Sequence, residues 1–286
     1  MRKFNIMNAL KLMRVGSYKL KKNNILSNIL DSEILLSKSL NKSREEMLIN
    51  LNITINKKNI KKFNQFLNRR LKKEPVAYIL GEKEFWSKKF LINNGVLIPR
   101  PETELLVDRL SRIYKEKKIS ILDMGTGSGC IIISLISILT KSYGDGIDIS
   151  NKAISLAKKN ANKYKLSNRI KFFKKSFNDI FSKKYDLIVS NPPYVMSKDI
   201  KNLSDDIKRF EPILALDGGN DGLDLIKKII YKSKNILKIN GTLAIEIGKG
   251  QFKKVSKILF DNKYRIYEVI KDYKHNVRCI LAKNIK

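Results

Sequence analysis

The run Asn191-Pro192-Pro193-Tyr194 directly follows the apolar stretch 186–190, which has the pattern of a strand. Two consecutive prolines cannot continue a β-ladder, because neither supplies a backbone N–H. The strand therefore ends on an amide side chain, carbonyl groups and an aromatic ring, at the carboxyl end where open α/β sheets bind ligands. These groups can accept hydrogen bonds from a planar –NH2 group and cover its face. With a methyl donor bound upstream, they predict a pocket for methylating an amide or an exocyclic amine.

A glycine-rich turn lies upstream, within the segment Ile-Leu-Asp-Met-Gly-Thr-Gly-Ser-Gly at 121–129. Glycines allow the backbone to approach a ligand closely. A dinucleotide fingerprint requires Gly-x-Gly-x-x-Gly, but counting from Gly125 the last position is Cys130, so the match fails. Asp123 precedes the turn by two residues and would repel a pyrophosphate, whereas it suits an ammonium group. The candidate residues of the loop are Gly125, Thr126, Gly127, Ser128 and Gly129.

Asp148 ends the next predicted strand, where a carboxylate can bind the two hydroxyl groups of a ribose. The glycine loop, Asp148 and the downstream Asn-Pro-Pro-Tyr run occur in this order along the chain. Together they predict a pocket for S-adenosylmethionine, with Asp123 near the amino-acid portion of the cofactor.

Methyl transfer from a sulfonium is an in-line displacement, so the protein must mainly orient the nucleophile. An amide nitrogen is a poor nucleophile because its lone pair is delocalised into the carbonyl. We expect the Asn191 side-chain oxygen and the Pro192 carbonyl to accept its two N–H bonds and favour developing positive charge. The Tyr194 ring would pack over the planar group and favour the cationic transition state.

The surrounding elements indicate an α/β protein with a small helical domain in front. Residues 1–81 show helical periodicity, residues 82–98 indicate a β-hairpin linker with a turn at Asn93-Asn94-Gly95 and a last extended piece at 97–98, and residues 99–286 form the larger domain. From Ile119 strands and helices alternate, which predicts a doubly wound, mostly parallel sheet of seven strands. The expected strands are 120–123, 147–149, 170–173, 185–190, 242–247, 264–270 and 277–282; the expected helices are 102–114, 130–139, 151–164, 223–237 and 252–260. The last two strands lack a helix between them, so one strand should be antiparallel.

The net charge of +32 arises from 59 Lys and Arg against 27 Asp and Glu. The excess is spread along the chain: residues 1–98 carry 21 basic and 7 acidic residues, and the remainder carries 38 and 20. We attribute it to compositional bias rather than to a nucleic-acid site. No apolar run reaches the roughly 20 residues of a membrane span, and Met1–Met7 lacks the apolar region of a signal peptide. Two cysteines provide neither a disulfide framework nor a metal site. A cytoplasmic monomer without a membrane partner is expected.

With these motifs, the chain resembles the HemK/PrmC family of bacterial release-factor glutamine methyltransferases. The resemblance covers nearly all of the chain and rests on a specific set of motifs. The matching stretches are Glu74–Gly81, Glu84–Trp86, Leu97–Glu104, Asp123–Gly129, Asn191–Tyr194, Arg209–Pro212, Ala215–Gly219, Asp221–Leu223, Glu246–Gly248 and Gln251. The family implies a Rossmann-like class I methyltransferase domain joined by a hairpin to an N-terminal helical domain that helps grip the release factor. It implies methylation of the side-chain N5 of the glutamine in the Gly-Gly-Gln motif.

The resemblance also assigns site residues. By position, Gly125–Gly129, Asp148, Phe177 and Asn191 would contact S-adenosylmethionine, and Asn191, Pro192, Pro193 and Tyr194 would hold the glutamine. The chain departs from the family at Ser176, where many members have an acidic residue near the adenine. Asp179 is nearby, but it does not align with the position of the acidic residue in the family motif.

Two related activities stay open from the residues. The sister enzyme that methylates a glutamine of a large-subunit ribosomal protein shares the donor loop and Asn-Pro-Pro-Tyr, but residues 100–104 and 84–86 favour the release-factor enzyme. An adenine-N6 methyltransferase would present a similar –NH2 group to the same motif. The chain has no recognisable DNA target-recognition domain after the motif, so a direct nucleic-acid substrate is not expected. A methyltransferase-like scaffold that only binds is disfavoured by the intact motifs.

Overall fold

The computed structural model describes residues 7–179 and 183–285. Residues 1–6, 180–182 and 286 belong to the predicted helical and catalytic domains and lie outside the described residues. The chain divides into two compact units, one formed by the residues up to Gly81 together with Asp205–Phe210, the other by Glu82–Ser204 and Glu211–Lys286.

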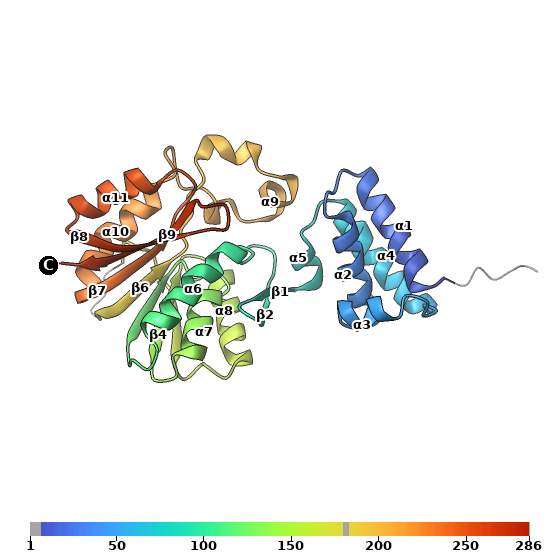
Figure 1. Cartoon of the computed structure of the whole chain (residues 1–286), viewed down its shortest axis with the longest axis horizontal. Coiled ribbons are helices and arrows are strands. Elements are labelled where there is room, and N and C mark those ends of the chain that lie inside the picture. Colours follow the sequence, from blue (N-terminus) through green and yellow to red (C-terminus); the bar gives the residue numbers. More distant parts are fainter. Residues whose placement is uncertain (1–6, 180–182, 286) are drawn as a thin grey trace, which may run out of the picture. The chain divides into compact units, whose positions relative to one another are not determined.

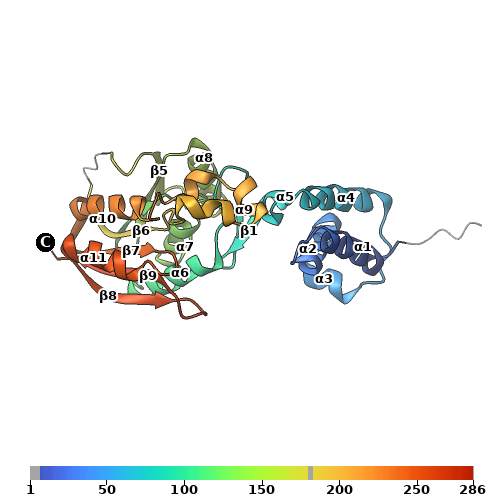
Figure 2. The same cartoon turned by 90° about the horizontal axis from the view of Figure 1, so that it is seen from above.

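The first unit is mainly helical (Figure 2), as the periodicity predicts for residues 1–81, whereas the helix at Asp205–Phe210 was not predicted. Its helices are α1 (Ala9–Lys22), α2 (Asn28–Leu40), α3 (Arg44–Ile49), α4 (Lys57–Leu71), α5 (Val76–Leu80) and α9 (Asp205–Phe210). The apolar faces of α1, α2 and α4 enclose the fully buried ring of Phe63. Beside this core, Arg70 pairs with Asp31 at 2.7 Å, so both buried charges are matched.

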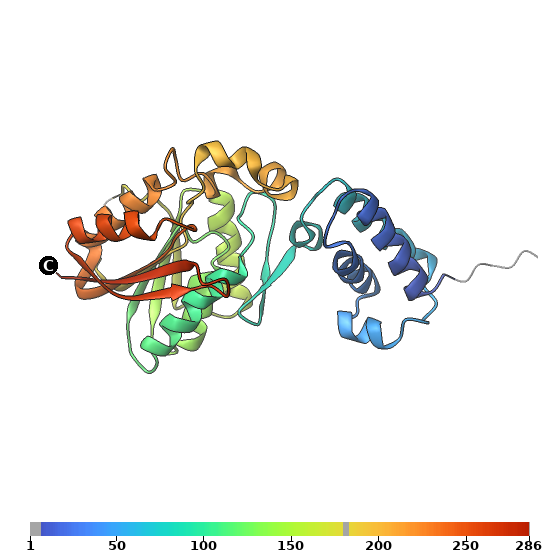
Figure 3. The same cartoon turned by 45° about the horizontal axis from the view of Figure 1, so that its top comes forward.

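The second unit is built on the predicted seven-stranded sheet (Figure 1). Its strands are β3 (Ser120–Met124), β4 (Tyr143–Asp148), β5 (Ile170–Lys174), β6 (Tyr185–Ser190), β7 (Leu237–Glu246), β8 (Tyr264–Lys271) and β9 (Val277–Asn284). They lie in the order β5-β4-β3-β6-β7-β9-β8, and β9 runs antiparallel to both of its neighbours. The β8–β9 hairpin forms one edge (Figure 3). The class of fold and its one antiparallel strand are therefore confirmed.

Helices cover both faces of this sheet (Figure 1). Helices α6 (Pro101–Ile113), α7 (Cys130–Ile138) and α8 (Asn151–Lys163) lie on one face; α10 (Asp224–Ile236) and α11 (Phe252–Asp261) lie on the other. Helix α10 buries Ile226, Ile229 and Ile230 in the core beneath it. None of the helices in the described ranges is long and apolar enough to cross a bilayer.

The hairpin before the sheet differs from the prediction. It consists of β1 (Glu82–Phe85) and β2 (Lys88–Leu91), and its turn is Trp86-Ser87, where both residues have φ near +50° (51° and 54°). Such two-residue turns usually carry Asn or Gly, so the residue types Trp and Ser do not indicate a turn at this position. Asn93-Asn94-Gly95 lies in the loop that follows β2, and residues 97–98 are not in a strand. The predicted turn position and final extended piece are wrong.

Three short helical segments after β6 were not predicted, and one of them is α9. A 3-10 helix covers Ser197–Asn202 and another covers Ile213–Ala215. They belong to the long connection between β6 and α10, where no apolar periodicity marks them.

Candidate functional site

The site lies where the strand order reverses. From β3 the chain proceeds outward through β4 to β5, then returns to place β6 on the other side of β3. Loops at the carboxyl ends of β3 and β6 therefore diverge and leave a crevice, the usual ligand position in such sheets. A cavity of about 280 Å³ occupies this position. Its lining includes Gly125, Thr126, Gly127, Ser128, Asp148, Phe177, Asn191 and Pro193.

Eight predicted site residues thus meet in one cavity, although they come from four separate stretches of sequence. Gly129, Pro192 and Tyr194 are not among the residues that line it. Thr103, in the first turn of α6, also lines the cavity and was not predicted as a site residue.

The glycine loop is held by backbone hydrogen bonds from β4. The N–H groups of Gly125 and Thr126 both donate to the carbonyl oxygen of Ile147 at 2.9 Å. Gly125 has φ +79°, and a Cβ atom there would point toward the Phe177 ring at 3.5 Å. Because Gly125 has no side chain, its backbone itself forms this part of the cavity wall.

Gly129 has a different role from the residues before it. It precedes α7 with φ +80°, and a Cβ atom would lie 3.2 Å from the Cβ of Ala157 and 2.9 Å from the Cδ1 of Ile133. A side chain would therefore separate α7 from α8. Gly129 permits the close packing of two helices at the base of the loop.

Asp148 joins the loop to the end of β4. One carboxylate oxygen accepts from the N–H of Gly127 at 3.0 Å, and the other accepts from the N–H of Ser150 at 2.9 Å. Burial raises the pKa of Asp148 above its ordinary value, and these backbone donors partly offset the shift. Each oxygen keeps a further lone pair for a ligand hydroxyl.

Asp123 is a fully buried carboxylate that is bonded to the glycine loop. Its Oδ2 accepts from the Thr126 hydroxyl at 2.7 Å, whereas its fully buried Oδ1 has no hydrogen-bond partner among the described residues. Burial raises the pKa of Asp123 to about 7. A nearby cationic group would compensate this unmatched oxygen. Asp123 is fully buried and is not among the residues that line the cavity, so the lining fits the ribose of a ligand through Asp148, and contact of an ammonium group with Asp123 stays a prediction.

The segment after β5 forms the opposite wall. Ser176, Phe177 and Asn178 line the cavity. Asp179 does not line it, because its carboxylate turns back to accept from the N–H of Ser176 at 2.8 Å. The departure from the family pattern noted at Ser176 therefore stands, and Asp179 does not replace the acidic residue.

The Asn191 side chain is oriented by a chain of hydrogen bonds. Its Nδ2 donates to the hydroxyl oxygen of Thr103 at 3.0 Å, and this hydroxyl donates to Oε2 of Glu246 at 2.7 Å. The Asn191 Oδ1 has no donor among the described residues. A free acceptor atom is thus presented beside the glycine loop.

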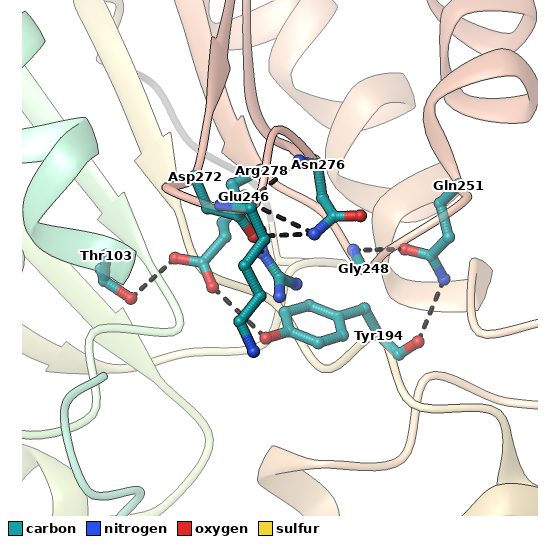
Figure 4. Close-up of polar contacts among 9 residues, drawn as sticks. Thr103, Tyr194, Glu246, Gly248, Gln251, Asp272, Asn276 and Arg278 are labelled. Atoms are coloured by element: carbon teal, nitrogen blue, oxygen red, sulfur yellow. Dashed lines mark hydrogen bonds and ion pairs between the residues drawn. The ribbon is translucent and has the colours of Figure 1, made fainter. Parts of the chain in front are cut away.

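The hydroxyl of Tyr194 points toward the Glu246 carboxylate, which the Thr103 hydroxyl reaches from the other side (Figure 4). The Tyr194 hydroxyl is 3.4 Å from Oε1 of Glu246, and the Tyr194 backbone carbonyl accepts from Nε2 of Gln251 at 3.0 Å. The Gln251 Oε1 accepts from the N–H of Gly248 at 2.7 Å. Gln251 therefore holds the main chain of the Asn-Pro-Pro-Tyr segment against the loop after β7.

Glu246 is a buried carboxylate at the end of β7. Burial raises its pKa to about 7, while the Thr103 hydrogen bond and the positive charge of Arg278 act in the opposite direction. Arg278 is itself fixed by Asp272 at 2.9 Å in the β8–β9 hairpin (Figure 4). Burial also raises the pKa of Tyr194 far above its usual value, so the phenol stays protonated.

Three residues with clear roles in the geometry had no assigned role in the sequence. Thr103, Glu246 and Gln251 all fall in stretches that match the family motifs. The motif match could have singled them out, but their contacts join segments that are far apart in the chain.

Comparison with known proteins places the chain in a family. Residues 11–81 match the model of the PrmC N-terminal domain, and residues 101–209 match the methyltransferase small domain. The release factor glutamine methyltransferase of Haemophilus influenzae is 37% identical, and the alignment covers 92% of this chain and 94% of that protein. The chain belongs to the release factor glutamine methyltransferase family.

Two further relatives match most of this chain. The release factor glutamine methyltransferase of Fusobacterium nucleatum is 40% identical over 92% of this chain and 75% of its own length. The bifunctional methyltransferase of Rickettsia conorii is 38% identical over 92% of this chain. The chain spans about half the length (55%) of that bifunctional relative.

Two solved structures share the fold of this chain at lower sequence identity. The catalytic domain of hMettl16 superposes with a TM-score of 0.56 at 18% identity, over 69% of this chain and 76% of that chain. A ribosomal protein methylase from Lactobacillus delbrueckii subsp. bulgaricus superposes with a TM-score of 0.50 at 19% identity, over 65% of this chain and 81% of that chain. These likenesses confirm the class I methyltransferase fold.

Proposed function

We propose that this protein transfers a methyl group from S-adenosylmethionine to the side-chain N5 of the glutamine in the Gly-Gly-Gln motif of peptide-chain release factors. The observation that carries the proposal is the free Oδ1 of Asn191, which shares one cavity with the glycine loop and Asp148. The names of the relatives that match most of the chain support the substrate.

The cofactor site would consist of residues from the ends of three strands and from Asn191. Asp148 would bind the ribose hydroxyls, and Phe177 would pack against the adenine. The loop residues Gly125, Thr126, Gly127 and Ser128 line the same cavity, with Gly129 behind them. When bound, S-adenosylmethionine supplies a methyl group already activated on a sulfonium.

The acceptor site would hold the glutamine amide by both of its N–H bonds. The Asn191 Oδ1 and the Pro192 carbonyl would accept them, which pins the nitrogen in one orientation. Both acceptors also stabilise positive charge that develops on this nitrogen during transfer. Pro193 would line the entry, and the Tyr194 ring would cover the planar amide.

We further propose a division of labour along the chain. A helical domain at 1–81 would grip the release factor, a linker at 82–98 would follow it, and a methyltransferase domain at 99–286 would carry out the transfer. The match of residues 11–81 to the PrmC N-terminal domain supports this division. So does an apolar patch on the helical unit, formed by Leu26, Ile29 and Leu30, whose exposed fractions are 98%, 62% and 46%. The protein would act as a cytoplasmic monomer without a direct nucleic-acid substrate.

A labelling experiment tests the substrate. The purified protein is incubated with radiolabelled S-adenosylmethionine and, in separate reactions, a release factor, its Gly-Gly-Ala variant, a mixture of ribosomal proteins and duplex DNA. We expect label on the release factor and none on the variant. Labelling of DNA or of a ribosomal protein, with none on the release factor, would instead identify one of the two related activities and refute the proposal.

A further inference from the structure

Two stretches that match the family motifs, residues 100–104 and 246–248, take no part in the donor or acceptor chemistry above. The structure brings one residue from each of them to Asn191. We propose that Thr103 and Glu246 are positioning residues, which fix the Asn191 carboxamide with its oxygen toward the substrate and its nitrogen away from it. This inference rests on the proposed function of Asn191 as an acceptor.

The sheet register places Glu246 next to Asn191. Strands β6 and β7 are parallel neighbours, and Ser190 pairs with Ile245. The residues that follow this pair are Asn191 and Glu246, so they emerge side by side at the carboxyl edge. Thr103, in the first turn of α6, lies between their side chains and bonds to both.

The buried Glu246 carboxylate determines which group donates and which accepts in the two hydrogen bonds that connect it to Thr103 and Asn191. An ionised carboxylate can only accept, so Glu246 requires the single hydroxyl proton of Thr103. The Thr103 oxygen is then left as an acceptor, and within the described part of the chain its donor is the NH2 group of Asn191. If the Asn191 carboxamide were reversed, its oxygen would face the Thr103 oxygen with no proton between them. The reversed state is therefore disfavoured.

The orientation matters because the two ends of a carboxamide have nearly the same shape and opposite hydrogen-bonding character. A reversed Asn191 would present NH2 to the NH2 of the substrate and repel it. Asparagine alone does not choose between the two states. The single hydroxyl proton of Thr103 is donated to Glu246, and its oxygen accepts from Asn191, so Thr103 acts through Asn191 although it lines the cavity.

The experiment compares Thr103→Val, which removes the hydroxyl at nearly constant volume, with Thr103→Ser, which keeps it. Thr242→Val is the matched control, because Thr242 is also buried and accepts from the Tyr114 hydroxyl at 2.7 Å, four residues before Glu246 in β7. We measure kcat for the release factor at saturating S-adenosylmethionine, together with the cofactor Kd by calorimetry. For Thr103→Val we expect kcat to fall at least 30-fold with the Kd within threefold of wild type. For Thr103→Ser and Thr242→Val we expect kcat within threefold.

A kcat for Thr103→Val within threefold of wild type would overturn the inference, as would equal losses for the valine and serine variants. A second measurement does not depend on the valine variant folding. In wild-type protein labelled with 15N-asparagine, one Asn191 side-chain amide proton should exchange with solvent at least tenfold more slowly than that of exposed asparagines. Free exchange of both protons would contradict the positioning role. If wild-type protein fails to label the release factor, the proposed function fails, while the exchange measurement still tests the orientation of Asn191.

Discussion

The side chain of Asn160 pairs with the backbone of Leu91 in both directions, accepting from its N–H at 2.8 Å and donating to its carbonyl at 3.1 Å. The same Asn160 NH2 group donates to the carbonyl of Ser128 at 2.9 Å. A buried residue of α8 therefore connects the β1–β2 hairpin to the glycine loop.

Replacement of Asn160 by alanine should destabilise the protein and loosen this loop. The change leaves three backbone groups without their partner, which we expect to lower the free energy of unfolding by about 2–4 kcal/mol. Chemical denaturation measures this loss, and calorimetry should show weaker cofactor binding. Asn162→Ala, at an exposed position of the same helix, is the control and should change neither quantity appreciably. Equal stability of the two variants would contradict the role of Asn160.

Gly129→Ala should reduce stability through packing as well as through backbone strain. Gly129 and Gly250 have nearly the same φ, +80° and +82°, but a Cβ atom at Gly250 meets nothing within 4 Å. Gly250→Ala should therefore cost only about 1 kcal/mol of strain. Gly129→Ala should cost at least about 1 kcal/mol more, because α7 and α8 must separate. Thermal denaturation of both variants measures the difference, and equal costs would show that the close approach of the helices is unimportant.

Asn191→Ala should abolish methyl transfer while leaving cofactor binding nearly intact. The variant loses the proposed acceptor oxygen, and removal of one such group typically costs about 10²–10³ in kcat. The measurement is a comparison of kcat with the cofactor Kd in the same preparation. Activity within a few-fold of wild type would exclude the proposed acceptor role.

The rate of transfer should fall as the pH drops through about 7. Protonated Glu246 becomes a donor, so the Thr103 hydroxyl is released to turn toward Asn191 and the carboxamide can reverse. The titratable and charged groups near Glu246 are Tyr194, Arg278, Glu102, Cys279 and Cys130, and burial raises the pKa of the Cys130 thiol so that it too stays neutral. Burial raises the pKa of Tyr194 and of Cys279, so both stay neutral near pH 7. Glu246→Gln should remove the inflection in kcat, because a carboxamide does not titrate in this range.

The kcat profile is measured at saturating cofactor, since Asp123 also has a pKa of about 7 and would act through cofactor affinity. An unchanged inflection near pH 7 in Glu246→Gln would assign the titration to another group.

The free energy of unfolding should also depend on the protonation of Glu246, and it should rise as the pH falls, whereas the rate of transfer should decrease. The folded-state pKa of Glu246 is about 7 and its ordinary value is 4.5, so the folded protein holds a proton that the unfolded chain releases between these values. The contribution to stability is complete below pH 4.5 and is lost as the pH rises to 7. Relative to wild type, Glu246→Gln should gain stability between pH 5 and pH 8, on the order of 3 kcal/mol. Urea denaturation at several pH values measures the difference, and a constant difference would contradict burial as the cause of the shift.

The order of elements and most of the cavity could be predicted from the sequence, because local signals mark them. Apolar periodicity indicated each helix of the sheet domain, and Asp148 and Asn191 were placed by the strand ends that precede them. A parallel sheet brings such ends to one edge whatever the details of packing.

Contacts between distant segments could not be predicted in the same way. The bond between Thr103 and Asn191 depends on how α6 packs over β6 and β7, and no local pattern encodes that distance. The Trp86-Ser87 turn was missed because its residue types are unusual for a left-handed pair. The bulky Trp86 is tolerated because the N–H of this residue is held by the Glu104 carboxylate at 3.1 Å.

The register that pairs Ser190 with Ile245 has a consequence for the order in which the protein is assembled. During synthesis from the amino terminus, the glycine loop and Asp148 emerge well before Glu246. A nascent chain that ends before β7 therefore contains the cofactor loop, Thr103 and Asn191, but not the carboxylate that accepts the proton of the Thr103 hydroxyl. Addition of β7 places Glu246 beside the end of β6, so the proposed orientation of Asn191 would be reached only after this strand has joined the sheet.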